Sequence, residues 1–245
     1  MITFACETKL EMDPLVKYSN VKLNMKRILS QAQELEWERE EELLVKWSNK
    51  NNLKEKVRQQ ILQEIMAMQG INHKNVLRLL ECKKSANNIY IFTELCNGGD
   101  LRRFLELKNE KLDEKLVKII IQQIAEGLSH LNENQILHRD LKLDNIFLNF
   151  PNYKVSGIVP DSYIEEFDHE MEEIEIIIGD LGFARSLENK ALTKSNVGTP
   201  LNMAPEIMNG DYYNSKVDIW SLGTMMYELL VGFTPFIGIS LNDLK

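Results

Sequence analysis

The sequence predicts an α+β fold, because strand-like runs and long helices with one apolar face both occur along the chain. Residues 176–178 are three consecutive isoleucines and residues 90–92 are Tyr-Ile-Phe, and such β-branched or aromatic runs are typical of strands. Elsewhere an apolar residue recurs at every fourth position, which predicts a helix with one buried face. The residues of this stripe are Leu112, Leu116, Ile120, Ile124 and Leu128.

A second helix is predicted over residues 55–70. Its apolar residues recur at helical spacing, and Glu64 lies among them. The apolar positions are Val57, Ile61, Ile65 and Met68.

The composition favours a single soluble domain in a reducing compartment. The chain has 245 residues, 44% of them hydrophobic, which is enough to bury one or two cores. Its net charge of −8 argues against nucleic acid or an anionic membrane surface as the main partner. Three cysteines without a C-x-x-C pair, and four scattered histidines, favour a cytoplasmic protein without a histidine or cysteine metal site.

Neither a secretory signal nor a transmembrane segment is predicted. The first seven residues lack the basic region and the long apolar core of a signal peptide. Residues 219–240 are strongly apolar, but Glu228 and Pro235 interrupt them, so we expect no membrane span there.

The most informative motif is the polar run at residues 138–145, His-Arg-Asp-Leu-Lys-Leu-Asp-Asn, between two apolar runs. Asp140 could accept the proton of a hydroxyl group, and Lys142 could neutralise charge on a transferred phosphoryl group. Asn145 could offer an oxygen to Mg²⁺. A polar turn without a chemical role is the alternative. However, the run matches the eight-residue pattern H-R-D-L-x-x-x-N in order, and this match favours phosphoryl transfer.

A second acidic residue follows the isoleucine run. Asp180 lies in Gly-Asp-Leu-Gly, where a buried strand would deliver its carboxylate to a turn that Gly182 permits. We expect Asp180 to be the second Mg²⁺ ligand, with Leu181 filling the adjacent apolar packing position. An ordinary Asp-x-Gly turn is the alternative for this tripeptide taken alone.

Two further motifs complete a family pattern. Residues 198–206 read Gly-Thr-Pro-Leu-Asn-Met-Ala-Pro-Glu, and residues 218–223 read Asp-Ile-Trp-Ser-Leu-Gly. With the runs at 138–145 and 179–185, they resemble the eukaryotic Ser/Thr protein kinase family. Within that family, the runs at 96–101, 182–185, 199–201 and 203–206 look most like the Unc-51-like autophagy-initiating kinases. The resemblance implies a two-lobed protein kinase-like fold, with an incomplete mostly β N-lobe, a helical C-lobe, and Asp218 tethering the catalytic loop.

The resemblance also implies an ATP- and Mg²⁺-dependent enzyme that acts on protein Ser/Thr hydroxyls. In the family the segment after the strand at 90–93 binds adenine, so the Glu94 carbonyl and the Cys96 amide are the candidates, with Thr93 as gatekeeper. Asp100 would lie near the ribose. Ala5 and Phe147 would line the nucleotide site and Lys9 would reach its phosphates.

Four residues are implied in regulation or substrate positioning. Glu64 would be the acidic residue of the C helix, and Arg139 would receive a phosphate from the activation segment. Ser195 is the candidate phosphorylation site, with Thr193 nearby, and an unmodified polar loop is the alternative. Thr199 would lie against the catalytic groups and favour Ser/Thr acceptors.

The domain division places the N-lobe at residues 1–93 and the C-lobe at residues 94–245. Spacing longer than the family habit predicts two inserts, one at about 11–53 and one at about 152–175. The first contains a charge-rich helix between Met25 and Trp47, either a solvated amphipathic helix or a binding element for a regulatory partner. The second is acidic, and we expect it to be a disordered or mobile loop.

The ends of the chain favour an incomplete kinase domain. The run Phe-Ala-Cys-Glu at residues 4–7 is the only stretch that we identify as resembling V-A-I-K, which puts Glu7 where the phosphate-binding Lys belongs. No sequence for a Gly-rich loop precedes it, and the last C-lobe helices are missing. A pseudokinase that serves as a non-catalytic binding or scaffold module is therefore the rival interpretation.

Overall fold

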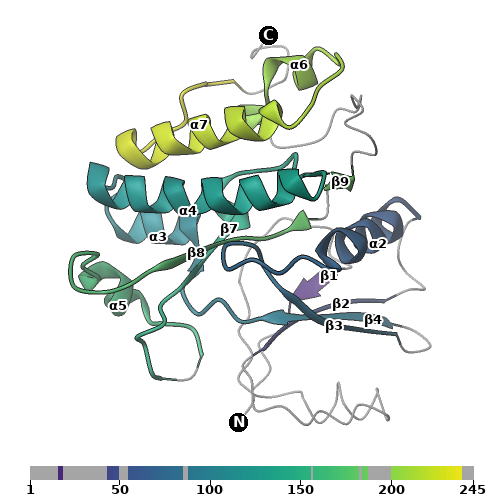
Figure 1. Ribbon diagram of the computed structural model, residues 1–245. Coiled ribbons are helices and arrows are strands. Elements are labelled where there is room, and N and C mark those ends of the chain that lie inside the picture. Colours follow the sequence, from purple (N-terminus) through teal and green to yellow (C-terminus); the bar gives the residue numbers. More distant parts are fainter. Residues whose placement is uncertain are drawn as a thin grey trace.

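The protein has a small sheet with one helix packed on it, and a larger, mainly helical part (Figure 1). The computed structural model describes residues 16–18, 43–49, 55–84, 88–155, 157–181, 184–186 and 200–238. In this part of the chain, no helix is long and apolar enough to cross a bilayer.

The small sheet has four antiparallel strands in the order β1-β2-β4-β3. The strands are β1 (Val16–Tyr18), β2 (Leu43–Asn49), β3 (Leu79–Lys84) and β4 (Asn88–Glu94). Helix α2 (Glu55–Met68) packs on the sheet through Ile61 and Ile65, which bury against Ile89 and Ile91 of β4. The helix predicted over residues 55–70 is confirmed and ends at Met68.

The predicted helix between Met25 and Trp47 is wrong over its last five residues. Leu43–Asn49 is strand β2, hydrogen-bonded to β1 on one side and to β4 on the other. Ladder hydrogen bonds on both edges outweigh local helix propensity, which is a weak determinant. Strands β1 and β2, which lie within the predicted insert at about 11–53, both pair in the sheet. The rest of that range lies outside the described residues.

The larger part is built on two long helices. Helix α4 (Glu114–Glu133) packs against α7 (Lys216–Val231), and the predicted apolar stripe of α4 is fully buried. The carboxylate of Asp113 begins α4 by accepting hydrogen bonds from the backbone N–H groups of Lys115 and Leu116. Short helices α3 (Leu101–Leu107) and α6 (Pro205–Met208) flank the two long ones.

Short strands connect the two parts. Strands β5 (Gly99–Asp100), β7 (Ile146–Asn149) and β8 (Glu175–Ile178) form one sheet, and β6 (Ile136–Leu137) pairs with β9 (Arg185–Ser186). Two backbone hydrogen bonds then join β8 to the segment before β3: Leu77 N donates to Ile178 O at 2.8 Å, and Ile178 N donates to Asn75 O at 2.9 Å. The sheet and the helical part are therefore tied at β8.

The acidic segment between β7 and β8 is ordered, so its expected mobility is wrong. It contains helix α5 (Asp161–Glu166), and Val159, Ile164 and Phe167 are buried. The ring of Phe167 makes edge contacts with Phe104 of α3 and with Phe150. The acidic residues that suggested disorder are mostly exposed, whereas Val159, Ile164 and Phe167 are buried in the main hydrophobic core.

The aromatic contacts of this segment predict a large effect of one substitution. Phe167→Ala should lower the free energy of unfolding by about 3–5 kcal/mol, because it removes a buried ring from a packed cluster. The matched control is Met171→Ala in the same segment, where the side chain is 82% exposed and the expected change is within about 0.5 kcal/mol. Urea unfolding of both variants measures this, and equal effects would contradict an ordered segment.

Candidate active site

The polar run at residues 138–145 lies between β6 and β7 and ends in the 3₁₀ turn Leu143–Asn145. The buried carboxylate of Asp218, on α7, holds its start: Oδ2 accepts a hydrogen bond from His138 N at 3.0 Å, and Oδ1 accepts one from Arg139 N at 2.9 Å. Arg139 has φ of +70°, a strained conformation for a residue with a side chain. The predicted tether by Asp218 is confirmed, and it stabilises this strained turn.

His138 joins the polar run to the strand that carries Asp180. Its ring Nδ1 accepts a hydrogen bond from Asp140 N at 3.3 Å, so the proton of a neutral ring sits on Nε2. Nε2 lies 2.8 Å from Gly179 O and donates to it. The buried imidazole therefore fixes the distance between the two predicted acidic residues.

The structure brings the three predicted catalytic residues together. The Nδ2 of Asn145 donates to Asp140 O at 2.7 Å and to Asp140 Oδ2 at 3.2 Å. Lys142 Nζ lies 3.5 Å from the same carboxylate oxygen. Asp140 is thus a buried carboxylate with a cation and an amide beside it, and the Oδ1 of Asn145 is the atom suited to a metal ion.

Asp180 follows β8 and is held close to Asn145. Gly179 N donates to Asn145 O at 2.9 Å, and Asp180 itself has φ of +51°. A Cβ at Gly179 would lie 2.2 Å from Cε2 of Phe147, so only glycine allows this approach. Leu181 is buried in the core, which agrees with its predicted packing role.

Asn145 and Asp180 would offer two oxygen atoms to a metal ion, and such a donor set suits Mg²⁺. This ion usually keeps several waters and takes one or two protein carboxylates plus phosphate oxygens. Within the described residues, no group of three His, Cys, Asp or Glu side chains could hold a metal without such help. The donor set therefore fits a magnesium ion that arrives with a nucleotide.

The predicted nucleotide-binding segment runs from the end of β4 to β5. Glu94 Oε1 accepts a hydrogen bond from Arg78 N at 2.8 Å, and burial raises the pKa of this carboxyl. Thr93 and Cys96 are buried. Asp100 caps α3 by accepting from Arg103 N at 2.8 Å, and burial also raises the pKa of Asp100.

Phe147 lies next to this segment, because its Cα pairs with that of Asp100 across β5 and β7. Glu64 is buried on α2. Arg139 Nη1 is 3.5 Å from the hydroxyl of Tyr213. The remaining predicted residues, Ala5, Lys9, Ser195 and Thr199, lie outside the described residues, as do Glu7 and Thr193.

Lys46 is a candidate that the sequence analysis missed. It ends the run Leu-Leu-Val-Lys at residues 43–46, and it lies 18 positions before Glu64, close to the spacing of roughly 20 expected for the phosphate-binding Lys. In the structure its Cα pairs with that of Ile91, in the strand that leads to the nucleotide-binding segment. The apolar run ending in Lys, just before the helix at 55–70, was the signal that could have identified it.

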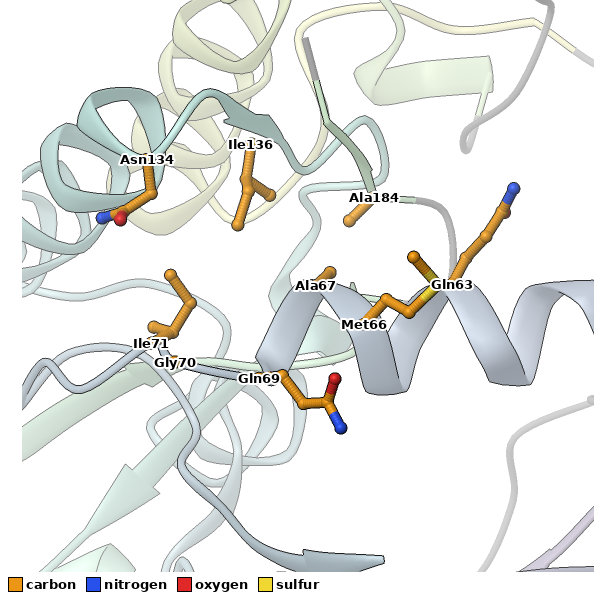
Figure 2. Close-up of a pocket in the computed structure, with 9 residues that line it drawn as sticks. All are labelled: Gln63, Met66, Ala67, Gln69, Gly70, Ile71, Asn134, Ile136 and Ala184. Carbon is orange, nitrogen blue, oxygen red and sulfur yellow. The ribbon is translucent and has the colours of Figure 1, made fainter. Parts of the chain in front are cut away.

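A separate cavity of about 440 Å³ lies beside the C-terminal end of α2 (Figure 2). Figure 2 shows Ala67 and Ile71 facing Ile136 and Ala184 across it, with the amides of Gln63, Gln69 and Asn134 around them. None of Asp140, Asn145 and Asp180 lines this cavity. It is therefore distinct from the candidate active site.

The chain matches the protein kinase domain family over residues 32–244. It is 35% identical to Serine/threonine-protein kinase ATG1c of Arabidopsis thaliana, over 81% of this chain and 24% of that protein. It is also 35% identical to Serine/threonine-protein kinase ULK1 of Homo sapiens, over 83% of this chain and 18% of that protein. Serine/threonine-protein kinase ULK3 of Xenopus laevis is 30% identical, over 84% of this chain and 39% of that protein. The chain thus spans well under half the length of these relatives, and the family match begins after Lys9.

The tether at Asp218 predicts a loss of stability in one variant. In Asp218→Asn the amide offers one acceptor oxygen in place of two, so one of the N–H groups of His138 and Arg139 faces an NH₂ group. Leaving a buried donor unsatisfied should lower the free energy of unfolding by about 1–3 kcal/mol. Urea unfolding measures it, with the exposed Asp211→Asn as the control. Equal stability of the two variants would show that the tether carries no energy.

Proposed function

Because the chain belongs to the protein kinase family, among relatives of the Unc-51-like type, we propose that it transfers the γ-phosphoryl group of ATP to Ser or Thr hydroxyls of a protein. The observation that carries this proposal is the buried Asp140 with Lys142 and Asn145 against it. The backbone bond from Gly179 to Asn145 supports Asp180 as the other acidic member of the site.

In the proposed reaction the substrate oxygen forms a bond to the γ-phosphorus as the bond to the bridging oxygen of ADP breaks. Asp140 accepts the hydroxyl proton, and Lys142 offsets negative charge that gathers on the transferred group. Asn145 and Asp180 would hold Mg²⁺, which when bound neutralises charge on the phosphate oxygens.

The nucleotide is proposed to bind at the segment between β4 and β5. The Glu94 carbonyl and the Cys96 amide would hydrogen-bond adenine, Phe147 would lie beside the ring, and Asp100 would face the ribose. Burial of Cys96 and the pairing of Asp100 with Phe147 support this arrangement. Ser195 phosphorylation, read by Arg139, stays a prediction, as does the substrate role of Thr199.

Lys46, in place of Glu7 or Lys9, is proposed as the phosphate-binding lysine, with Glu64 of α2 as its partner. Kinases carry this lysine on the strand that precedes the C helix. Strand β2 precedes α2 and pairs with β4, which supports the assignment. The consequence is that the carboxylate of Glu7 need not oppose ATP binding.

Radiolabelled phosphoryl transfer from Mg-ATP to a generic Ser/Thr peptide tests the reaction. We expect the chain to show transfer, and Asp140→Asn to lower kcat by about 10²–10⁴-fold, since a positioned base contributes on this order. Asp180→Asn should also abolish transfer, whereas the exposed Asp211→Asn should leave it unchanged. A chain that binds Mg-ATP but transfers nothing would favour the rival non-catalytic binding module.

The choice between the two lysines is tested by nucleotide affinity. Lys46→Met should weaken Mg-ATP binding about tenfold or more, because losing a charged hydrogen-bond partner of a phosphate costs about 1.5–3 kcal/mol. Lys9→Met is the matched control and should leave the Kd unchanged. Calorimetric titration of both variants gives the answer, and the reverse pattern would restore Lys9 as the phosphate ligand.

A further inference from the structure

The loop between β4 and α3 is tied to the end of β7 by the side chain of Asn97. Its Oδ1 accepts a hydrogen bond from Phe150 N at 2.7 Å, and its Nδ2 donates to Phe150 O at 3.1 Å. Gly98 N donates to Leu148 O at 2.8 Å, which is a second link between the loop and β7. An amide side chain that uses both its ends on one backbone unit fixes position and orientation together.

The carbonyl groups of this loop are held by the segment between β7 and β8. Val159 N donates to Asn97 O at 2.8 Å, and Arg103 Nη1 donates to Gly98 O at 3.1 Å. The same guanidinium donates through Nη2 to Val159 O at 3.1 Å and to Asp161 Oδ1 at 2.5 Å. Arg103 therefore bridges the loop and the segment, and two successive carbonyls of the loop point to that side.

The segment can serve as a rigid support because it is anchored independently of the loop. Lys108 Nζ donates to Glu165 O at 2.9 Å and to Phe167 O at 2.7 Å, and the aromatic contacts of Phe167 bury it against α3. Figure 1 shows α5 beside α3, at the end of the molecule away from α2.

The loop itself is shaped for this close contact. A Cβ on Gly98 would lie 2.7 Å from both Cβ of Leu148 and Cε2 of Phe150, so a side chain there would push the loop off β7. Gly99 has φ of +72°, and its N–H closes a turn onto Cys96 O at 3.4 Å. The backbone of Cys96 therefore begins a turn that ends at Gly99, and Gly98 within this turn is bonded to β7.

We propose that the segment between β7 and β8 is a clamp that holds residues 96–99 in the conformation that binds the nucleotide, with Asn97 and Arg103 as positioning residues. The proposal rests on the proposed function, since it takes Cys96 and its neighbours as the adenine site. A loop ordered before binding loses less conformational entropy when the nucleotide arrives, so the clamp raises affinity without touching the ligand.

The alternative is that the segment only stabilises the helical part of the protein. A comparison of substitutions at Arg103 and Lys108 distinguishes the two roles. Arg103 and Lys108 both lie at α3 and both donate to two backbone carbonyls, but only Arg103 contacts the loop. A stabilising role predicts similar effects of Arg103→Ala and Lys108→Ala, whereas a clamp predicts an effect of Arg103→Ala on the nucleotide.

The test uses the chain as it stands, with two measurements on Arg103→Ala, Asn97→Ala and the control Lys108→Ala. Hydrogen exchange is followed without nucleotide at the Gly98 and Gly99 amides, and the Kd for Mg-ADP is measured by calorimetry. In Arg103→Ala and Asn97→Ala we expect exchange to be at least tenfold faster and the Kd to rise five- to tenfold. Lys108→Ala should change neither the exchange rate nor the Kd, even if it lowers the melting temperature as much as Arg103→Ala does.

Unchanged exchange in both Arg103→Ala and Asn97→Ala overturns the clamp, and faster exchange with an unchanged Kd overturns its role in positioning the nucleotide. Should Arg103→Ala fail to fold, Asp161→Asn weakens the same bridge at its exposed end and is measured in its place. A parent chain that does not bind Mg-ADP overturns the proposed function, while the exchange data still decide whether the loop is clamped.

Discussion

The candidate active site depends on one buried carboxylate, that of Asp218. It accepts hydrogen bonds from two successive backbone N–H groups and so holds Arg139 at positive φ, which would otherwise be unfavourable for a residue with a side chain. The reversal of the chain at that point turns Asp140 toward Lys142 and Asn145. A buried acceptor can impose such a strained turn because losing it would leave two donors without a partner, at about 1–3 kcal/mol each, whereas the strain of one residue costs about 1–3 kcal/mol.

From this turn, a continuous series of hydrogen bonds reaches the small sheet. Asn145 O accepts from Gly179 N, His138 bonds Gly179 O, and Ile178, one residue earlier, exchanges backbone bonds with Asn75 and Leu77. Every step involves the main chain, so the geometry depends little on the rotamer of any surface residue. The acidic residues that would bind metal and accept a proton are therefore set in one frame with the segment that leads into β3 and β4.

The parts of the site that are local in sequence could be predicted from the sequence. Asp140, Lys142 and Asn145 lie within six residues, and Asp180 follows an unmistakable strand, so neighbouring residues identify them. Lys46 was missed although the apolar run that ends in it is a local signal, because β2 takes part in the sheet by pairing with β1 and β4, which lie far from it in sequence. The prediction of a mobile loop between β7 and β8 was wrong for a different reason. The charge of this segment is evident from the sequence, whereas its order comes from a few apolar residues that pack on α3.

Helix α3 connects the loop that follows β4, the proposed nucleotide site, with the polar run at residues 138–145, and two consecutive arginines make the connection. Successive residues on a helix point about 100° apart, so Arg102 and Arg103 reach different neighbours. Arg102 Nη1 bonds the buried Glu228 of α7 at 2.6 Å, and its Nε lies 3.7 Å from Asp144 of the catalytic loop. Arg103 bonds the loop that follows β4. Because Glu228 is buried, losing Arg102 would leave a charge without its partner, which is among the costliest changes a protein interior can undergo. That penalty keeps α3 in one position against α7, and the loop held by Arg103 is therefore fixed relative to Asp140 as well.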